Sequence, residues 1–186
     1  ETQELVYWIA GDCRGKLSPR ILDVGTGSGC IAVSLAKLVD GATVEAWDVS
    51  EEALGVAARN ADKNGADVFF RQQDVLMAVP GDARYEVIVS NPPYIAEQEK
   101  SGMDTNVLEW EPSLALFVSD DDPLIFYRTI ALLAKDMLVE DGLLYFEINQ
   151  AYGQETMQML EKLGYTSVEL RKDGWGNDRM IKAKRP

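Results

Sequence analysis

A glycine-rich turn is the first feature of this sequence that could do chemistry. Residues 23–29 read Asp-Val-Gly-Thr-Gly-Ser-Gly and follow a short apolar run. Glycine has no side chain, so its backbone can approach a ligand closely, and a helix that starts here offers unpaired N–H groups. A merely tight turn and a dinucleotide-binding turn remain alternatives, although Cys30 stands where the latter has its third glycine. The candidate ligand-binding residues are Asp23, Gly25, Thr26, Gly27 and Gly29.

Two acidic side chains follow at the ends of later apolar runs. Asp48, with Val49 after it, comes about twenty residues after the glycine turn, where a carboxylate can accept hydrogen bonds from both hydroxyls of a ribose. Asp74 is placed to accept a hydrogen bond from an adenine amino group, with the N–H of Val75 beside the ring. Each acid alone is compatible with a helix-entry or turn residue. Together with the glycine turn, they favour nucleoside binding.

The most specific motif is Asn-Pro-Pro-Tyr, where a fourth apolar run ends. Pro92 and Pro93 fix the backbone and remove two N–H donors. The amide oxygen of Asn91 and the carbonyl of Pro92 can then act as preset acceptors for a substrate NH₂ group, which needs two partners once it is desolvated. Tyr94 offers a flat face on which a planar group can stack. We therefore expect Asn91, Pro92 and Tyr94 to be catalytic and, with Pro93, to bind the substrate, and we expect Asn91 to bind the cofactor as well. A rigid polar turn is the structural alternative.

The elements that must position these motifs alternate along the chain. Apolar runs predict strands at 20–24, 43–47, 68–72, 85–90, 143–148, 166–170 and 179–184. Helices are predicted at 4–9, 28–39, 50–64, 123–139 and 154–163, with a long loop over 91–122. This alternation indicates an α/β fold with a doubly wound, mostly parallel, seven-stranded sheet. The last two strands have no helix between them and are predicted to form an antiparallel C-terminal hairpin.

The amino-acid composition excludes several kinds of partner and catalytic chemistry. The formal net charge of −13 would repel nucleic acid, which normally meets a basic face, so we expect no direct nucleic acid binding. The chain has no histidine, which excludes His-based acid–base catalysis and the usual His-containing zinc sites, and we expect no metal. Two cysteines are too few for a disulfide framework and favour a reducing, cytoplasmic compartment. No apolar run is long enough to span a membrane. We also expect the protein to be a monomer.

Taken together, these motifs resemble the class I methyltransferases that modify nitrogen. More closely, the chain is similar to the release-factor glutamine methyltransferase family. Further stretches carry this resemblance: Glu-Thr-Gln-Glu-Leu-Val at 1–6, Asn-Pro-Pro-Tyr-Ile at 91–95, Glu-Pro-Ser-Leu-Ala-Leu at 111–116 and Gly-Asn-Asp-Arg at 176–179. Gln3 departs from the pattern, because the family commonly has glutamate there.

The resemblance implies a Rossmann-like class I fold and S-adenosylmethionine as cofactor. The methionine end would lie against the glycine turn, the ribose at Asp48 and the adenine at Asp74 and Val75. It implies methylation of a glutamine side-chain amide in a protein, in particular the Gly-Gly-Gln loop of a peptide chain release factor. Glu111 would lie on the substrate side. We expect residues 1–186 to form the catalytic domain, without the small helical domain that precedes it in the family.

Other functions remain open from sequence. An adenine-N6 DNA methyltransferase uses the same kind of Asn-Pro-Pro-Tyr turn, although the acidic charge and the lack of a target-recognition segment weigh against it. A methyltransferase acting on a ribosomal protein or a small amine is a further enzyme alternative, and a non-catalytic domain that binds S-adenosylmethionine is another class of answer. We interpret the tryptophans as packing or loop anchors; they are Trp8, Trp47, Trp110 and Trp175.

Overall fold

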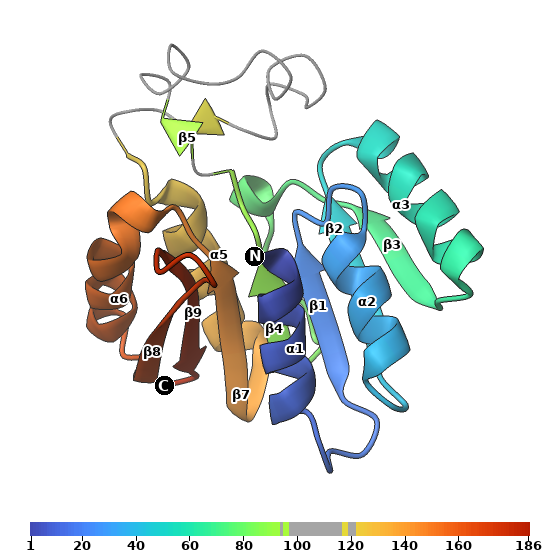
Figure 1. Cartoon of the computed structure of the whole chain (residues 1–186), viewed down its shortest axis with the longest axis horizontal. Coiled ribbons are helices and arrows are strands. Elements are labelled where there is room, and N and C mark those ends of the chain that lie inside the picture. The colour runs from blue at the N-terminus through green and yellow to red at the C-terminus, as the bar shows by residue number, and fades with distance from the viewer. Residues whose placement is uncertain (94, 97–116, 119–121) are drawn as a thin grey trace.

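The computed structural model describes residues 1–93, 95–96, 117–118 and 122–186. Three residues named above, Tyr94, Trp110 and Glu111, lie outside the described residues, so the predictions that concern them stay predictions. Figure 1 shows a central sheet with helices on both faces.

The central sheet has seven strands in the order β3-β2-β1-β4-β7-β9-β8. The first five run parallel to one another, and β9 is antiparallel to both of its neighbours. This confirms the predicted α/β class and the antiparallel C-terminal pair. The bounds are β1 (Arg20–Val24), β2 (Thr43–Asp48), β3 (Val68–Gln72), β4 (Tyr85–Ser90), β7 (Leu138–Glu147), β8 (Thr166–Lys172) and β9 (Asp178–Lys184).

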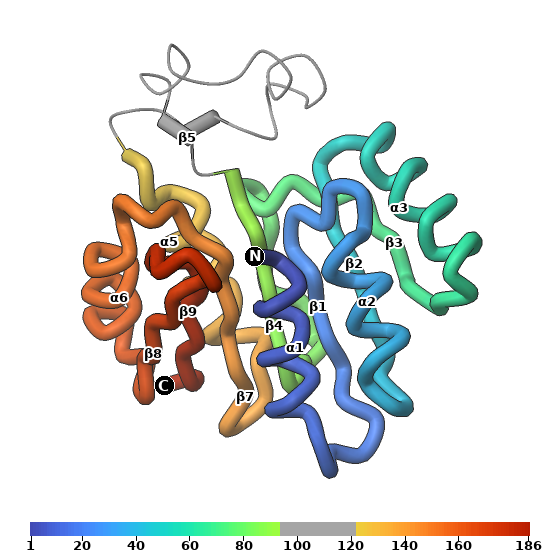
Figure 2. Tube along the Cα trace, in the orientation of Figure 1, coloured from blue at the N-terminus to red at the C-terminus, as the bar shows by residue number. Residues whose placement is uncertain are grey.

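Helices cover both faces because each one turns an apolar stripe toward the sheet. One apolar cluster joins α1 (Thr2–Asp12) and α2 (Cys30–Leu38) to one face, where α3 (Glu51–Asn64) also packs. The other cluster joins α5 (Ile125–Met137) and α6 (Gly153–Lys162) to the opposite face. Figure 2 traces the connections between these layers. Short 3₁₀ turns, η1 (Val75–Met77) and η4 (Gln150–Tyr152), complete the connections.

Some predicted boundaries were wrong. The helix predicted to reach residue 139 ends at Met137, and β7 begins at Leu138 instead of residue 143. The reason is tertiary, because Leu138 is fully buried and pairs with Tyr85 of β4. The predicted loop 91–122 also contains two short paired strands, β5 (Ile95–Ala96) and β6 (Phe117–Val118).

The tryptophans divide into two groups. Trp8 and Trp47 are 7% and 3% exposed, which confirms that they pack in the interior. The Trp8 ring also meets the Tyr145 ring edge-on, with centroids 5.6 Å apart. Trp175 is 86% exposed and is not a packing residue.

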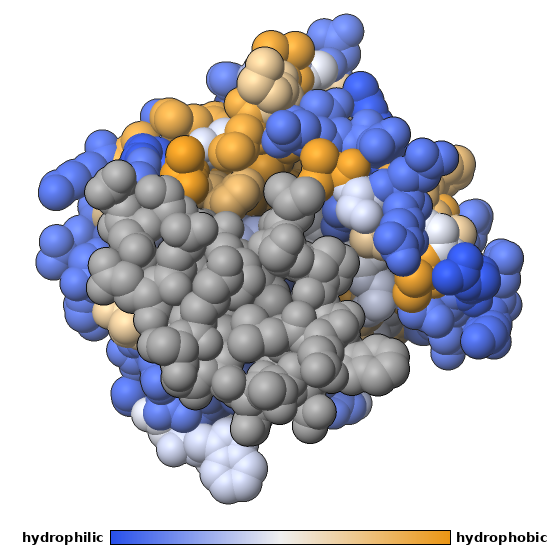
Figure 3. Space-filling view, turned by 90° about the horizontal axis from the view of Figure 1, so that it is seen from above, coloured by the Kyte–Doolittle hydropathy of each residue, from blue (hydrophilic) through white to orange (hydrophobic). Residues whose placement is uncertain are grey.

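The carboxyl ends of the parallel strands all reach the upper edge of the sheet in Figure 1. Figure 3 is seen from this side and shows apolar residues gathered along one flank of the molecule, with mostly hydrophilic residues elsewhere around it. The predicted motifs follow the strands directly and therefore lie at this edge. Ligands of open parallel sheets bind at the same edge.

The contact between α2 and α3 depends on a glycine. Gly29 has a φ of +82°, and a Cβ added to it would lie 2.9 Å from the Cβ of Ala57. We expect Gly29→Ala to lower the free energy of unfolding by about 2 to 4 kcal/mol, from backbone strain and overpacking together. Gly65→Ala is the matched control, because Gly65 has a φ of +58° with nothing near its Cβ position. The control should lose only about 1 kcal/mol. Urea unfolding followed by circular dichroism would measure both, and equal losses would contradict the packing argument.

Candidate functional site

The candidate residues form a row along the carboxyl edge of the sheet. The strand order β3-β2-β1-β4 places Asp74, Asp48, the turn 23–29 and Asn91 next to one another in that sequence. Parallel strands present these positions at the same edge. Residues that are up to 68 positions apart in the chain, from Asp23 to Asn91, therefore face a common region.

Backbone hydrogen bonds join the glycine turn to the end of β2. The N–H groups of Gly25 and Thr26 both donate to the carbonyl of Trp47, at 2.8 and 2.9 Å. The N–H of Gly27 donates to Oδ2 of Asp48 at 2.8 Å. The turn and the predicted ribose-binding acid therefore form one rigid unit.

These hydrogen bonds change the explanation for why the turn contains glycine. The sequence predicted unpaired N–H groups at the start of the helix, whereas within the turn the N–H groups of Gly25, Thr26, Gly27 and Gly29 all donate within the protein. A Cβ at Gly25 or Gly27 would meet no atom of the described residues within 4 Å, so these residues leave the space beside the turn open. Among the described residues the turn can therefore admit a ligand through its missing side chains, and not through these N–H groups.

A buried carboxylate supports the turn from below. Asp23 is fully buried at the end of β1, and its Oδ2 accepts hydrogen bonds from Thr26 Oγ1 at 2.6 Å and from the N–H of Ala32 at 3.2 Å. Burial raises the pKa of Asp23 to about 7, against the opposing effect of these two donors. Its Oδ1 is buried without a hydrogen-bond partner in the described structure. An unpaired buried acceptor is costly, so a ligand donor at this position would stabilise it.

The two acids of the neighbouring strands lie in connected turns. Oδ1 of Asp48 accepts a hydrogen bond from the N–H of Ser50 at 2.9 Å, at the start of α3. The carbonyl of Asp48 accepts one from the N–H of Gln73, which holds the chain beside Asp74. Asp74 caps η1 through a bond from the N–H of Leu76. Val49, adjacent to Asp48, is 50% exposed and borders the same region.

Asn91 lies at the carboxyl end of β4, next to β1. Oγ of the preceding Ser90 donates to the carbonyl of Val24 at 2.6 Å, which ties the end of β4 to the end of β1. Pro92 is buried and Pro93 is half-buried. Oδ1 of Asn91 is buried and has no hydrogen-bond partner among the described residues. The position therefore holds a desolvated acceptor, which suits an NH₂ donor.

Sequence reasoning missed Glu147, at the end of β7. Ser90 of β4 pairs with Phe146 of β7, so Glu147 is next to Asn91 in strand register. Glu147 is 3% exposed, burial raises its pKa, and its Oε2 accepts a hydrogen bond from Thr2 Oγ1 at 2.7 Å. A charged residue inside the apolar run 143–148 was the signal that could have identified it.

Solved structures identify the class of fold. The chain aligns over 98% of its length with a SAM-dependent O-methyltransferase from Thermotoga maritima, of which it covers 64%, at 18% identity and a TM-score of 0.71. It aligns over 97% with a methyltransferase from Pyrococcus furiosus, of which it covers 82%, at 20% identity and a TM-score of 0.68. The fold is that of the class I S-adenosylmethionine-dependent methyltransferases.

Sequence comparisons identify the family. The profile of the methyltransferase small domain family matches residues 9–109. The chain is 52% identical, over its whole length, to the release factor glutamine methyltransferase of Bacteroides thetaiotaomicron, of which it covers 66%. It is 43% identical, over 99% of its length, to the Lactococcus lactis protein of the same name, of which it covers 67%. The chain belongs to the release factor glutamine methyltransferase family.

The chain spans about two thirds of the length of these curated relatives, at 66%, 65% and 67% of three of them. In the part of the chain that the structure describes, no helix is long and apolar enough to cross a membrane. No group of three or more His, Cys, Asp and Glu side chains within the described ranges is arranged to hold a metal ion.

The raised pKa of Asp23 predicts a pH-dependent stability. Between about pH 4 and pH 7 the unfolded chain loses this proton while the folded chain keeps it. The contribution of Asp23 is therefore fully present at low pH and is lost as the pH rises through about 7. Asn mimics the neutral carboxyl, so Asp23→Asn should gain stability relative to the parent by on the order of 1 to 4 kcal/mol between pH 4 and pH 8. Urea titrations of both proteins across this range would measure the difference, and a constant difference would contradict the assignment.

Proposed function

We propose that the chain is the catalytic domain of an enzyme that transfers a methyl group from S-adenosylmethionine to the side-chain amide nitrogen of a protein glutamine. The preferred substrate is the Gly-Gly-Gln loop of a peptide chain release factor. The membership of the family supports this proposal. The observation that carries it is Oδ1 of Asn91, at the end of β4 beside the glycine turn, which is buried and has no hydrogen-bond partner in the described part of the chain.

The cofactor would be held along the row of turns. The carboxylate of Asp48 is oriented by Gly27 and Ser50 and keeps acceptor capacity for the two ribose hydroxyls. Asp74 and Val75, after β3, take the adenine. The open space at Gly25 and Gly27 admits the methionine part, and the unpartnered Oδ1 of Asp23 supplies an acceptor beneath the turn. The bound cofactor supplies an electrophilic methyl group on a sulfonium.

Asn91 and Pro92 hold the substrate NH₂ group. Amide nitrogen is a poor nucleophile, because its lone pair is delocalised into the carbonyl. Two fixed acceptors, Asn91 Oδ1 and the Pro92 carbonyl, favour a pyramidal nitrogen and direct its lone pair. Pro93 keeps this backbone rigid. Catalysis by these residues is positioning and electrostatics, and the nitrogen loses one proton as it gains the methyl group.

Two further residues belong to the proposal through the family resemblance. Tyr94 follows the turn and packs on the plane of the amide, and Glu111 lies on the substrate side. The charge of −13 favours a protein over a nucleic acid substrate. We also propose that the protein acts as a monomer in the cytoplasm, where its substrate is found.

The central test is transfer of labelled methyl groups to a release factor with a Gly-Gly-Gln loop. We expect label on that glutamine and about 100-fold less turnover for Asn91→Ala, because one of the two acceptors is lost. Binding of S-adenosylhomocysteine, measured by calorimetry, should change less than about threefold, since this variant keeps the cofactor-binding turns. A substrate Gln→Glu variant and duplex DNA serve as controls. Label on DNA adenine alone would replace the proposed substrate with a nucleic acid.

The cofactor side is tested separately with Asp48. Asp48→Ala should weaken binding of S-adenosylhomocysteine about 10- to 100-fold, because a charged acceptor for two hydroxyls is lost. Asp62→Ala is the control, since Asp62 is an exposed acid further along α3. Equal affinities for the two variants would remove Asp48 from the cofactor site.

A further inference from the structure

The β8–β9 turn carries an exposed tryptophan at the same edge of the sheet as Asn91. β8 and β7 run in the same direction, because both are antiparallel to β9, so the turn 173–177 lies at the carboxyl edge. Neighbouring strands are about 4.8 Å apart, which places β9 about 10 Å from β4 across β7. Trp175 in this turn is 86% exposed. A protein substrate whose glutamine is bound at Asn91 would extend about 10 Å or more from that residue and so reach the turn.

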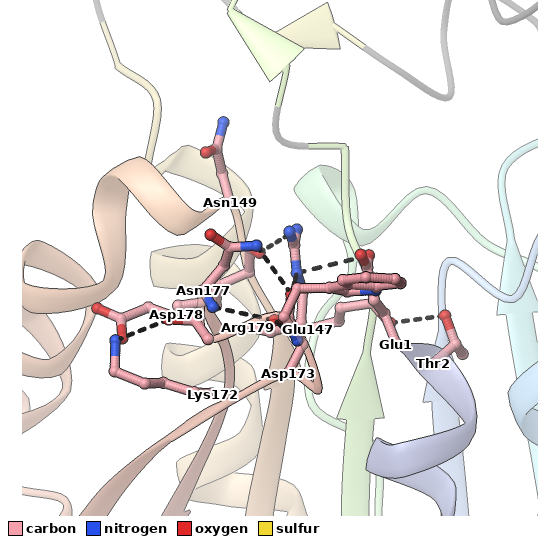
Figure 4. A network of polar contacts seen from close by, with 12 residues as sticks. Glu1, Thr2, Glu147, Asn149, Lys172, Asp173, Asn177, Asp178 and Arg179 are labelled. Atoms are coloured by element: carbon pink, nitrogen blue, oxygen red, sulfur yellow. Dashed lines mark hydrogen bonds and ion pairs between the residues drawn. The ribbon is translucent and has the colours of Figure 1, made fainter.

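A buried carboxylate makes the turn rigid. The side chain of Asp173 is fully buried, and its Oδ1 accepts hydrogen bonds from the N–H groups of Trp175 and Asn177, both at 2.9 Å. Its Oδ2 accepts one from Nε of Arg179 at 3.3 Å (Figure 4). Burial alone would raise the pKa of Asp173, but these donors hold it below its usual value. The backbone that carries Trp175 is therefore ordered before any partner binds.

The same arginine braces the turn against the end of β7. Nη1 of Arg179 donates to the carbonyl of Ile148 at 3.3 Å, and the N–H of Ile148 donates to the carbonyl of Arg179 at 2.9 Å. Ile148 follows Glu147, the neighbour of Asn91 in strand register. Hydrogen bonds and strand pairing therefore connect the Trp175 turn to the proposed substrate-binding residue.

An acidic side chain lies beside this turn among charges that are already paired. Oε1 of Glu4 is 3.4 Å from the position of a Cβ at Gly174, next to Trp175. Oε2 of Glu1 pairs with Nε of Arg179 at 3.5 Å, and Nζ of Lys172 donates to the carbonyl of Gly176 and pairs with Asp178 (Figure 4). An exposed indole beside the Glu4 carboxylate suits a cationic side chain, because the ring face attracts cations and the carboxylate adds to that field.

We infer that Trp175 and Glu4 form a docking point for a basic segment of the protein substrate, with an arginine or lysine side chain stacked on the indole. This inference rests on the proposed function, because the occupant is the protein that brings its glutamine to Asn91. Tryptophan is enriched among the residues that dominate protein interfaces, and a rigid turn loses little entropy on binding. Docking here raises the affinity for the intact protein without a part in methyl transfer.

Steady-state kinetics with the intact release factor test this inference. We expect Trp175→Ala to raise KM about 3- to 20-fold, with kcat and the affinity for S-adenosylhomocysteine within twofold of the parent. Trp175→Phe should recover most of the loss, because it keeps an aromatic face. Leu17→Ala is the matched control, since Leu17 is 96% exposed in the connection between α1 and β1, at the amino edge of the sheet.

A second pair of variants tests how much the charge of Glu4 contributes to substrate docking. Glu4→Gln should raise KM about 2- to 5-fold and weaken its dependence on salt, whereas Glu161→Gln, at an exposed position of α6, should leave KM unchanged. An unchanged KM for Trp175→Ala in an active enzyme would overturn the docking inference alone. Loss of cofactor affinity together with the rise in KM would assign Trp175 a structural role instead. A parent protein that binds S-adenosylhomocysteine but does not methylate the release factor would remove the proposed function, and the inference with it.

Discussion

The hydrogen bonds between the glycine turn and the end of β2 are the constraint on which the site depends. Gly25 and Thr26 donate to the carbonyl of Trp47, and Gly27 donates to the carboxylate of Asp48. Since these bonds join two neighbouring strand ends, a shift of either strand would separate the turn from its acid. The sheet register therefore sets the geometry of the proposed cofactor site, and two bonds to a backbone carbonyl and one to the Asp48 side chain hold the glycines in place.

Three buried carboxylates mark the same edge of the sheet, and their surroundings differ. Burial dominates at Asp23 and Glu147 and raises the pKa of both. At Asp173, two backbone N–H groups and Arg179 outweigh burial and lower the pKa. The number of donors explains the difference, since hydrogen bonds to the charged form favour ionisation. Asp23 thus lies beneath the cofactor turn as a group that is about half-protonated near pH 7, whereas Asp173 is a charged anchor for the β8–β9 turn.

The edge combines features that serve different parts of the proposed reaction. Toward β3, the acids and the glycine turn suit a nucleoside with a positively charged sulfonium. At β4, Asn91 offers an amide an acceptor that has no partner within the described ranges. Beyond β7, the turn that carries Trp175 presents an aromatic face next to acidic side chains. In the proposed reaction, a protein substrate would extend along the sheet edge from the docking contact at the C-terminal pair to the turn at Asn91.

The apolar runs and turn residues of the sequence by themselves determined the α/β class, most of the strands and the antiparallel C-terminal pair. These signals are local: alternation, glycine, proline and capping residues act within a few positions. Tertiary structure decided that Leu138 belongs to a strand, that Glu147 stands beside Asn91 and that the N–H groups of Gly25, Thr26, Gly27 and Gly29 are already bonded. Each of these depends on which strands become neighbours. That choice is made by burial and pairing between segments far apart in the chain, so no local pattern of residues can specify it.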